Sequence, residues 1–279
     1  MSEILARSSA HWSEAGRAGM DAFYRLATDD YRHLALARDW TAFFEAAQAR
    51  VGGRSLRLLD VACGSGKFPN ALVRHAGLGS ARIRPIDTSL LDPSAFSIAE
   101  ARAALPVPFL PGAELETTLQ EMDVPAEGHD VVWATHALYA VPEPELGEAM
   151  AKFVEAIAPG GQGIVAHSAE AGHYVAFHGL YLRAFGAPGV ARYVSAETVA
   201  AALRKAGATV EVQEVSYDSV AGPDDVDAVE GYLQRCVFDD SASLERMLAT
   251  EPLGAYLRGC RDATGWRFAQ RAWLMAVTA

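Results

Sequence analysis

Apolar positions along this chain change repeatedly between two spacings. Short, nearly continuous apolar runs predict β-strands, and longer segments with apolar residues three or four apart predict helices. The expected strands lie at residues 56–61, 82–87, 107–110, 130–135, 163–167, 209–215 and 268–277. Because helical segments separate most of these strands, the pattern predicts an α/β fold.

Residues 1–50 carry no strand signal and have the apolar spacing of helices. Helices that precede the first strand of such a fold either pack outside the sheet or cover a ligand as a lid. Aromatic side chains suit a lid, so Tyr24 and Tyr31 are candidates for substrate binding. Ordinary helix packing is the alternative for both residues.

The stretch from Leu58 to Phe68 reads LLDVACGSGKF. An apolar run ends in an acid, enters a loop with glycines two apart, and continues into a helical pattern. Glycine lets the loop adopt positive φ, and the helix N-terminus presents unpaired N–H groups, so a nucleotide-binding turn is predicted. Pro69 stands at the third glycine position of a dinucleotide fingerprint, and the first glycine of a P-loop is missing, so neither motif fits.

This stretch resembles motif I of class I S-adenosylmethionine methyltransferases, (L/V)-L-D-x-G-x-G-x-G, with Ala62 at the first glycine position. Two later segments extend the resemblance in the same order along the chain. Residues 130–141 match the family's D-x-V segment, and residues 158–161 match the L-x-P-G-G turn that precedes its fifth strand.

The resemblance implies a Rossmann-like seven-stranded sheet in the order 3-2-1-4-5-7-6, with the last strand antiparallel. It divides the chain into an N-terminal helical lid at 1–50 and a methyltransferase domain at 51–279. Helical insertions that bind substrate are expected after strands 5 and 6, at about residues 169–194 and 223–260.

The same resemblance implies S-adenosylmethionine as cofactor and S-adenosylhomocysteine as its product. Asp87 ends the expected second strand and would bind the ribose hydroxyls, unless it is a helix cap or a surface acid. Glu114 follows the third strand and would contact the adenine. The cofactor-binding candidates are Asp60, Ala62, Cys63, Gly64, Gly66, Asp87, Thr88, Glu114 and Thr135.

Methyl transfer requires that the protein align the nucleophile, exclude water and, where needed, take a proton. Beyond strand four the chain is similar in plan to the small-molecule methyltransferases related to histamine N-methyltransferase. This likeness makes His136, as base or substrate orienter, and Tyr139 the catalytic candidates. The acid that binds the amine in those enzymes has no clear match, although Asp29 and Asp30 lie nearby. The substrate-binding candidates are Tyr24, Tyr31, His167, His178 and Gln270.

Composition restricts the partners. The chain has 279 residues, a formal net charge of −11 and a pI of about 5.2, which disfavours nucleic acid and anionic membranes. Its three cysteines are scattered, and no carboxylate cluster is visible near strand four, so neither a disulfide framework nor a metal is expected. No signal peptide or membrane span is visible, so a cytoplasmic monomer or homodimer acting on a small molecule is expected.

The sequence therefore predicts a methyltransferase that acts on a nitrogen or an activated ring carbon of a small aromatic or heterocyclic, natural-product-like molecule. Methylation of a phenol oxygen is an alternative. A nicotinamide-dependent oxidoreductase on a Rossmann sheet and a noncatalytic S-adenosylmethionine-binding protein are the alternatives from other classes.

Overall fold

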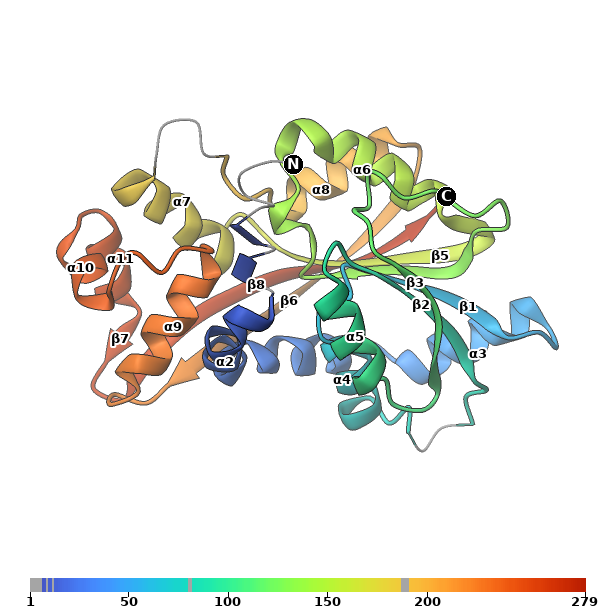
Figure 1. Ribbon diagram of the computed structural model, residues 1–279, viewed down its shortest axis with the longest axis horizontal. Helices are drawn as coiled ribbons and strands as arrows, with labels where there is room; N and C mark the ends of the chain where they lie inside the picture. Colours follow the sequence, from blue (N-terminus) through green and yellow to red (C-terminus); the bar gives the residue numbers. More distant parts are fainter. Residues whose placement is uncertain (1–6, 9, 12, 80–81, 187–190) are drawn as a thin grey trace.

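A single mixed sheet forms the centre of the molecule, and helices cover both of its faces (Figure 1). The computed structural model describes residues 7–8, 10–11, 13–79, 82–186 and 191–279. The strands are β1 (Leu56–Val61), β2 (Ile86–Leu91), β3 (Phe109–Leu115), β4 (His129–Thr135), β5 (Ile157–Ser168), β6 (Thr209–Ala221), β7 (Arg261–Asp262) and β8 (Gly265–Thr278). The helices are η1 (Glu14–Gly16), α2 (Arg17–Leu36), α3 (Trp40–Val51), α4 (Lys67–His75), α5 (Ala95–Ala104), η2 (Leu138–Ala140), α6 (Glu143–Glu155), α7 (His173–Phe185), α8 (Ala196–Lys205), α9 (Val226–Cys236), α10 (Leu244–Ala249) and α11 (Leu253–Gly259).

The strand order is β3-β2-β1-β4-β5-β8-β6, and the two-residue β7 pairs with β8 outside this path. Neighbouring strands from β3 to β5 are parallel, whereas β8 runs antiparallel to both β5 and β6. When β8 is counted as the seventh long strand, the predicted order 3-2-1-4-5-7-6 with an antiparallel last strand is confirmed.

The second strand lies four residues later than the sequence pattern predicted. Residues 82–87 were expected, but β2 spans Ile86–Leu91, because Arg84 and Pro85 are exposed whereas every residue of Ile86–Leu91 except Asp87 is buried. Val61 pairs with Leu91, so β1 and β2 end side by side. Asp87 therefore lies near the start of β2, and Asp92 follows its carboxyl end.

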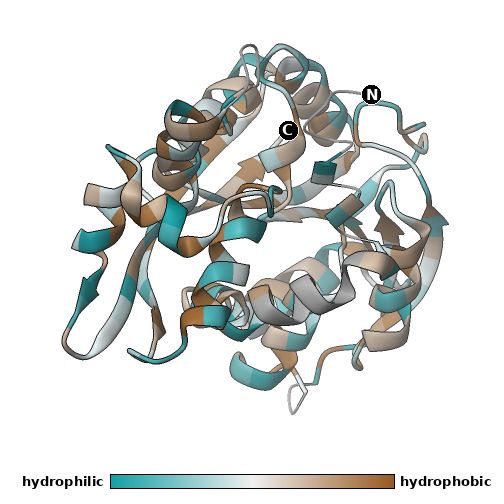
Figure 2. Ribbon diagram, turned by 60° about the vertical axis from the view of Figure 1, so that its left-hand side comes forward, coloured by the Kyte–Doolittle hydropathy of each residue, from teal (hydrophilic) through white to brown (hydrophobic). Residues whose placement is uncertain are grey.

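Successive residues of the strands pack into different apolar clusters on the two faces of the sheet. Leu59 and Val61 pack in the cluster that includes α6 and α8, whereas Leu56 and Leu58 pack in the cluster that includes α3 and α4. The helices that flank the sheet show hydrophilic and hydrophobic residues side by side, as expected for amphipathic helices (Figure 2). This packing holds the carboxyl ends of the strands in place.

A third apolar cluster joins α2 to α7, α9, α10 and α11, beyond the end of the sheet where β8 begins (Figure 1). Of the expected lid at 1–50, residues 1–6, 9 and 12 lie outside the described residues, as do residues 187–190 of the first insertion. α3 packs against the sheet, and α2 is the part of the expected lid that contacts α4, α9 and β6. Among the described residues, no helix combines the length and apolar character needed to cross a membrane.

Candidate functional site

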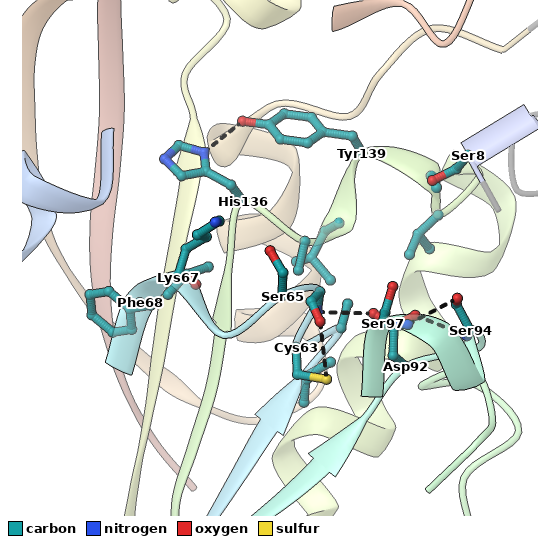
Figure 3. A pocket seen from close by; sticks show the side chains of 18 of the residues that line it. Ser8, Cys63, Ser65, Lys67, Phe68, Asp92, Ser94, Ser97, His136 and Tyr139 are labelled. Carbon is teal, nitrogen blue, oxygen red and sulfur yellow. Dashed lines mark hydrogen bonds between the residues drawn. The ribbon is translucent and has the colours of Figure 1, made fainter. Parts of the chain in front are cut away.

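A cavity opens where β1, β2 and β4 end (Figure 3). Residues of α2, α7 and α9 also line it. Its lining includes many of the residues that the sequence singled out. The sequence candidates in the lining are Tyr24, Tyr31, Asp60, Ala62, Cys63, Gly64, Thr135, His136 and Tyr139.

The loop after β1 has left-handed backbone at every second residue. The φ angles of Ala62, Gly64 and Gly66 are 51°, 51° and 67°. Gly66 directly precedes α4 as its N-cap residue and is not in the cavity lining, but a Cβ there would lie 3.3 Å from the backbone of Ala101. Gly66 therefore permits the turn and the close approach of α5, while Ala62 and Gly64 lie at the cavity wall.

Ala62 adopts a conformation that costs an L-residue about 1–2 kcal/mol. Replacing Ala62 with glycine should raise the free energy of unfolding by up to about 1 kcal/mol, because strain relief exceeds the entropy that glycine adds to the unfolded chain. Urea unfolding would measure this change. The matched control is Ala151→Gly in the exposed face of α6, which should lower the free energy of unfolding by about 1 kcal/mol. Losses of equal size in both variants would contradict a strained Ala62.

Asp92 holds the acidic position at the end of β2. Its Oδ2 accepts a hydrogen bond from the Gly64 N–H at 3.1 Å, and its Oδ1 accepts one from the Ser94 N–H at 2.9 Å. Burial raises the pKa of this carboxyl to about 6, against the two backbone hydrogen bonds that lower it. The group is therefore largely ionised at neutral pH, and its remaining lone pairs are available at the cavity wall.

The structure does not place Asp87 at the cavity. Its side chain lies against Gly112 of β3, where a Cβ would be 2.2 Å from Asp87 Oδ1, and it is exposed. The sequence missed Asp92 because both acids follow apolar residues, and only the strand register distinguishes them.

Asp60 and Cys63 also border the loop. Burial raises the pKa of Asp60 to about 7, and the nearby Asp92 adds to this effect. Burial also raises the pKa of the Cys63 thiol, with Asp60 and Asp92 adding to it, so the thiol stays protonated. Cys63 is therefore a packing residue at the wall and not a nucleophile.

Two other cofactor candidates lie away from the cavity lining. Thr88 is fully buried inside β2, and its hydroxyl donates to the Ile86 carbonyl at 3.3 Å. Glu114 lies on the edge strand β3 and pairs with Arg102 at 2.9 Å. Residues 118–120, just beyond β3, line the cavity instead.

Three substrate candidates are buried behind the lining. His167 Nε2 bonds the Val194 carbonyl at 3.0 Å, and His178 accepts the Tyr193 N–H at 3.1 Å. Gln270 donates to Ser219 at 3.1 Å and to Tyr232 at 2.9 Å. Burial lowers the pKa of His167 to about 4 and that of His178 to about 3, so both are neutral and support the wall.

Aromatic rings from three elements surround His136 at the end of β4. The His136 ring centroid lies 5.9 Å from that of Tyr31 on α2 and 5.9 Å from that of Tyr174 on α7. Its Nδ1 lies 3.0 Å from the Tyr139 hydroxyl, while its Nε2 is buried with no hydrogen-bond partner among the described residues. Burial lowers the pKa of His136 to about 3, and His167 adds a smaller effect, so the ring is neutral at physiological pH.

Asp30 is the acid of α2 that reaches the cavity. The residue is 2% exposed and accepts a hydrogen bond from the Tyr174 hydroxyl, whereas its Oδ1 accepts none from the described residues. Burial raises its pKa to about 7, although the Tyr174 hydrogen bond lowers it. The helical spacing of the sequence could have indicated that Asp30, and not Asp29, faces inward. Asp30 lies three residues after the buried Ala27 and four residues from the buried Leu26 and Leu34, so it shares their face of the helix.

Two further residues line the cavity: Tyr174, one of the aromatic residues that the sequence places in the insertion after strand five, and Arg235, which the sequence did not indicate. Tyr174 lies on α7 inside the expected insertion. Arg235 on α9 is 4% exposed, donates to the His11 carbonyl, and has a pKa that burial lowers to about 10. The described residues contain no group of three or more His, Cys, Asp or Glu side chains arranged to hold a metal ion.

Comparison with known proteins gives one family and many similar folds. A family described as "Methyltransferase domain" matches residues 29–213. A candidate methyltransferase from Bacillus halodurans is similar in structure, with a TM-score of 0.53, 15% identity, and coverage of 85% of this chain and 98% of that chain. Magnesium protoporphyrin IX methyltransferase from Synechocystis, solved with bound S-adenosylhomocysteine, has a TM-score of 0.53 and 13% identity, and the match covers 99% of this chain and 100% of that chain. The YcgJ protein from Bacillus subtilis has a TM-score of 0.53 and 13% identity, and the match covers 86% of this chain and 97% of that chain.

At these identities the likeness to the solved structures concerns the fold. A search of curated protein sequences finds no match.

Proposed function

Since this chain belongs to the methyltransferase family that matches residues 29–213, we propose that it transfers a methyl group from S-adenosylmethionine to a nitrogen of a small aromatic or heterocyclic molecule. When bound, this cofactor supplies a methyl group on a sulfonium, the electrophile of the reaction. The single observation that supports a nitrogen acceptor is the buried Asp30 carboxylate at the wall of an aromatic chamber.

The residues around the loop fit the cofactor. Asp92 offers a buried carboxylate beside Gly64, which suits the two hydroxyls of a ribose. Asp60 offers a second carboxylate, which suits the ammonium of the methionine end. The left-handed backbone at Ala62 and Gly64 lets a ligand approach closely, and residues 118–120 would surround the adenine. Cationic cofactor and acidic wall are thus complementary in charge.

Residues of this chain would prepare the acceptor. The rings of Tyr31, Tyr139 and Tyr174 would hold a flat molecule and exclude water. Asp30 would accept a hydrogen bond from the acceptor N–H and take the proton that the nitrogen loses once it is methylated. A pKa of about 7 suits a base that works near neutral pH. The same carboxylate could take the proton of an activated ring carbon, which makes carbon methylation the second candidate.

We assign the lid to α2 alone. Its residues Phe23, Tyr24, Ala27, Asp30 and Tyr31 line the cavity, whereas α3 packs against the sheet. The Tyr24 hydroxyl lies 3.3 Å from the Ser65 hydroxyl, and the ammonium of Lys67 lies 4.3 Å from the Tyr24 ring. These contacts hold α2 over the loop that follows β1.

Two measurements test the proposal. Calorimetry should show S-adenosylhomocysteine binding and no binding of NADH. Incubation with S-adenosylmethionine and matched panels of aromatic amines, electron-rich carbocycles and phenols should release S-adenosylhomocysteine fastest with amines. A preference for phenols would overturn the nitrogen assignment, and binding of NADH alone would overturn the cofactor assignment.

A further inference from the structure

A short hydrogen-bond chain fixes the protons around His136. The backbone N–H of Ser168 donates to the Tyr139 hydroxyl oxygen at 3.3 Å. The same hydroxyl lies 3.0 Å from His136 Nδ1, as the dashed line in Figure 3 shows. The chain begins at a backbone group that can only donate, and it ends at an imidazole nitrogen that can either donate or accept.

Two arrangements of protons are possible, and they leave different groups unsatisfied. If His136 Nδ1 donated to Tyr139, the phenolic proton would have only the nearby Ser168 hydroxyl to turn to, with which it forms no well-aligned hydrogen bond, and the Nε2 lone pair would also be unused. If Tyr139 donates to Nδ1, its oxygen and its proton both have partners, and only the Nε2–H remains free. A buried polar group left without a partner costs about 1–3 kcal/mol, so the second arrangement is favoured.

Neither ring offers an ionised alternative near neutral pH. Burial holds the pKa of Tyr139 well above its usual range, and burial lowers the pKa of His136 to about 3. His167, which contacts Tyr139, is likewise neutral and bonds Val194 through Nε2. A neutral imidazole carries one proton, and the hydrogen-bond chain leaves that proton on Nε2.

We propose that Tyr139 locks His136 in the Nε2–H form, which makes His136 a hydrogen-bond donor to the substrate and not a base. The acceptor molecule must then present a lone pair to Nε2–H, such as a pyridine-type nitrogen or a carbonyl oxygen, beside the N–H that faces Asp30. The role of His136 as a donor to the substrate rests on the proposed function, whereas the position of the proton on Nε2 does not.

The left-handed backbone of His136 supports a functional reason for its orientation. Its φ of 53° is uncommon for a residue other than glycine, and it occurs at the end of β4 beside the cavity. Ala166 accepts the His136 N–H at 2.8 Å, which anchors this strained residue to β5. The ring is therefore held by its backbone on one side and by Tyr139 on the other.

The direct test is a proton–nitrogen correlation spectrum of the histidine rings in ¹⁵N-labelled protein, with His136 assigned by its loss in His136→Gln. We expect Nε2 to be protonated and Nδ1 to be bare at every pH from about 6 to about 8, since the pKa of the ring lies far below this range. In Tyr139→Phe this fixed form should give way to a mixture of both tautomers. A protonated Nδ1 or an imidazolium in the wild-type protein would overturn the proposal.

A matched pair of ring probes tests the donor role in the presence of S-adenosylhomocysteine. Imidazole carries a pyridine-type lone pair and pyrrole does not, although the rings have the same shape. At about pH 8, where imidazole is mostly neutral, imidazole should shift the His136 Nε2–H resonance and pyrrole should leave it unchanged. Equal shifts from both probes, or none from imidazole, would overturn the donor role.

Turnover separates this inference from the proposed function. His136→Gln keeps an N–H donor of similar reach and should retain kcat/KM within about tenfold, while His136→Leu should lose about ten- to a hundredfold, mainly through KM. Equal losses in both variants would contradict donation. If the spectrum shows Nε2–H but no amine is methylated, the proposed function fails and the proton assignment stands.

Discussion

Replacing Asp92 with asparagine should weaken the binding of S-adenosylhomocysteine by about a hundredfold. Hydrogen bonds to an ionised group contribute about 1.5–3 kcal/mol each, and a ribose diol offers two of them, so the loss of charge should cost about 3 kcal/mol. Asp92 is well suited to this role because backbone N–H groups of Gly64 and Ser94 already orient its carboxylate. Titration calorimetry at neutral pH would measure the change.

The control for this prediction is Asp87→Asn. Asp87 is the acid that the sequence pattern favoured, but it lies near the start of β2, whereas Asp92 follows the end of the same strand, and the Asp87 side chain is exposed beside β3. Its replacement should leave the affinity unchanged. If Asp87→Asn weakened binding and Asp92→Asn did not, the ribose site would not lie at the end of β2, and thermal unfolding of both variants would exclude a general loss of structure.

The contrast between these two acids shows how far the sequence alone could predict the site. The loop after β1 was located correctly, because its glycine spacing and the preceding apolar run are local features. The end of β2 was not, because the arginines and Pro85 before Ile86 blur the start of the strand. Pairing with β1 decides which acid reaches the cavity, and pairing is a property of the whole sheet.

The sequence also could not show which candidate residues line the cavity and which lie buried behind that lining. His136 and His167 both lie at the ends of strands, yet His136 lines the cavity and His167 lies behind Tyr139. Gln270 is fully buried in a network with Ser219 and Tyr232, which no residue spacing indicates. Residue type was enough to identify the aromatic region. Whether a given residue lines the cavity or lies behind its lining depends on packing between segments that are distant in the sequence.

Replacing Asp30 with asparagine should lower kcat/KM for an aromatic amine by about a hundredfold or more, while the affinity for S-adenosylhomocysteine stays the same. General bases typically contribute about 10²–10⁴-fold, and an amide can accept a hydrogen bond but cannot take the proton. Steady-state kinetics, with calorimetry for the cofactor product, would measure both quantities. The matched control is Asp29→Asn, because Asp29 is only partly buried and its carboxylate lies 3.1 Å from both Arg32 and His33.

The pH dependence of kcat/KM should also show that Asp30 acts as the base. The base is active when ionised, and the pKa of Asp30 is raised to about 7. With S-adenosylmethionine saturating, so that the titration of Asp60 and Asp92 does not limit cofactor binding, kcat/KM for the amine should rise as pH increases through about 7 and then level off. The titratable groups that interact with this carboxylate are Asp29, Tyr31, Tyr139, Tyr174, Tyr217, Tyr232 and Cys236. Burial holds the pKa of the five tyrosines and of Cys236 well above their usual values, so none of these six groups titrates near pH 7. The substrate should be an aromatic amine that stays neutral from about pH 5.5 to about pH 8.5, so that its own titration does not contribute to the pH dependence of kcat/KM. The rise should disappear in Asp30→Asn and persist in Asp29→Asn; a rise that survives in Asp30→Asn would assign the proton transfer to another group.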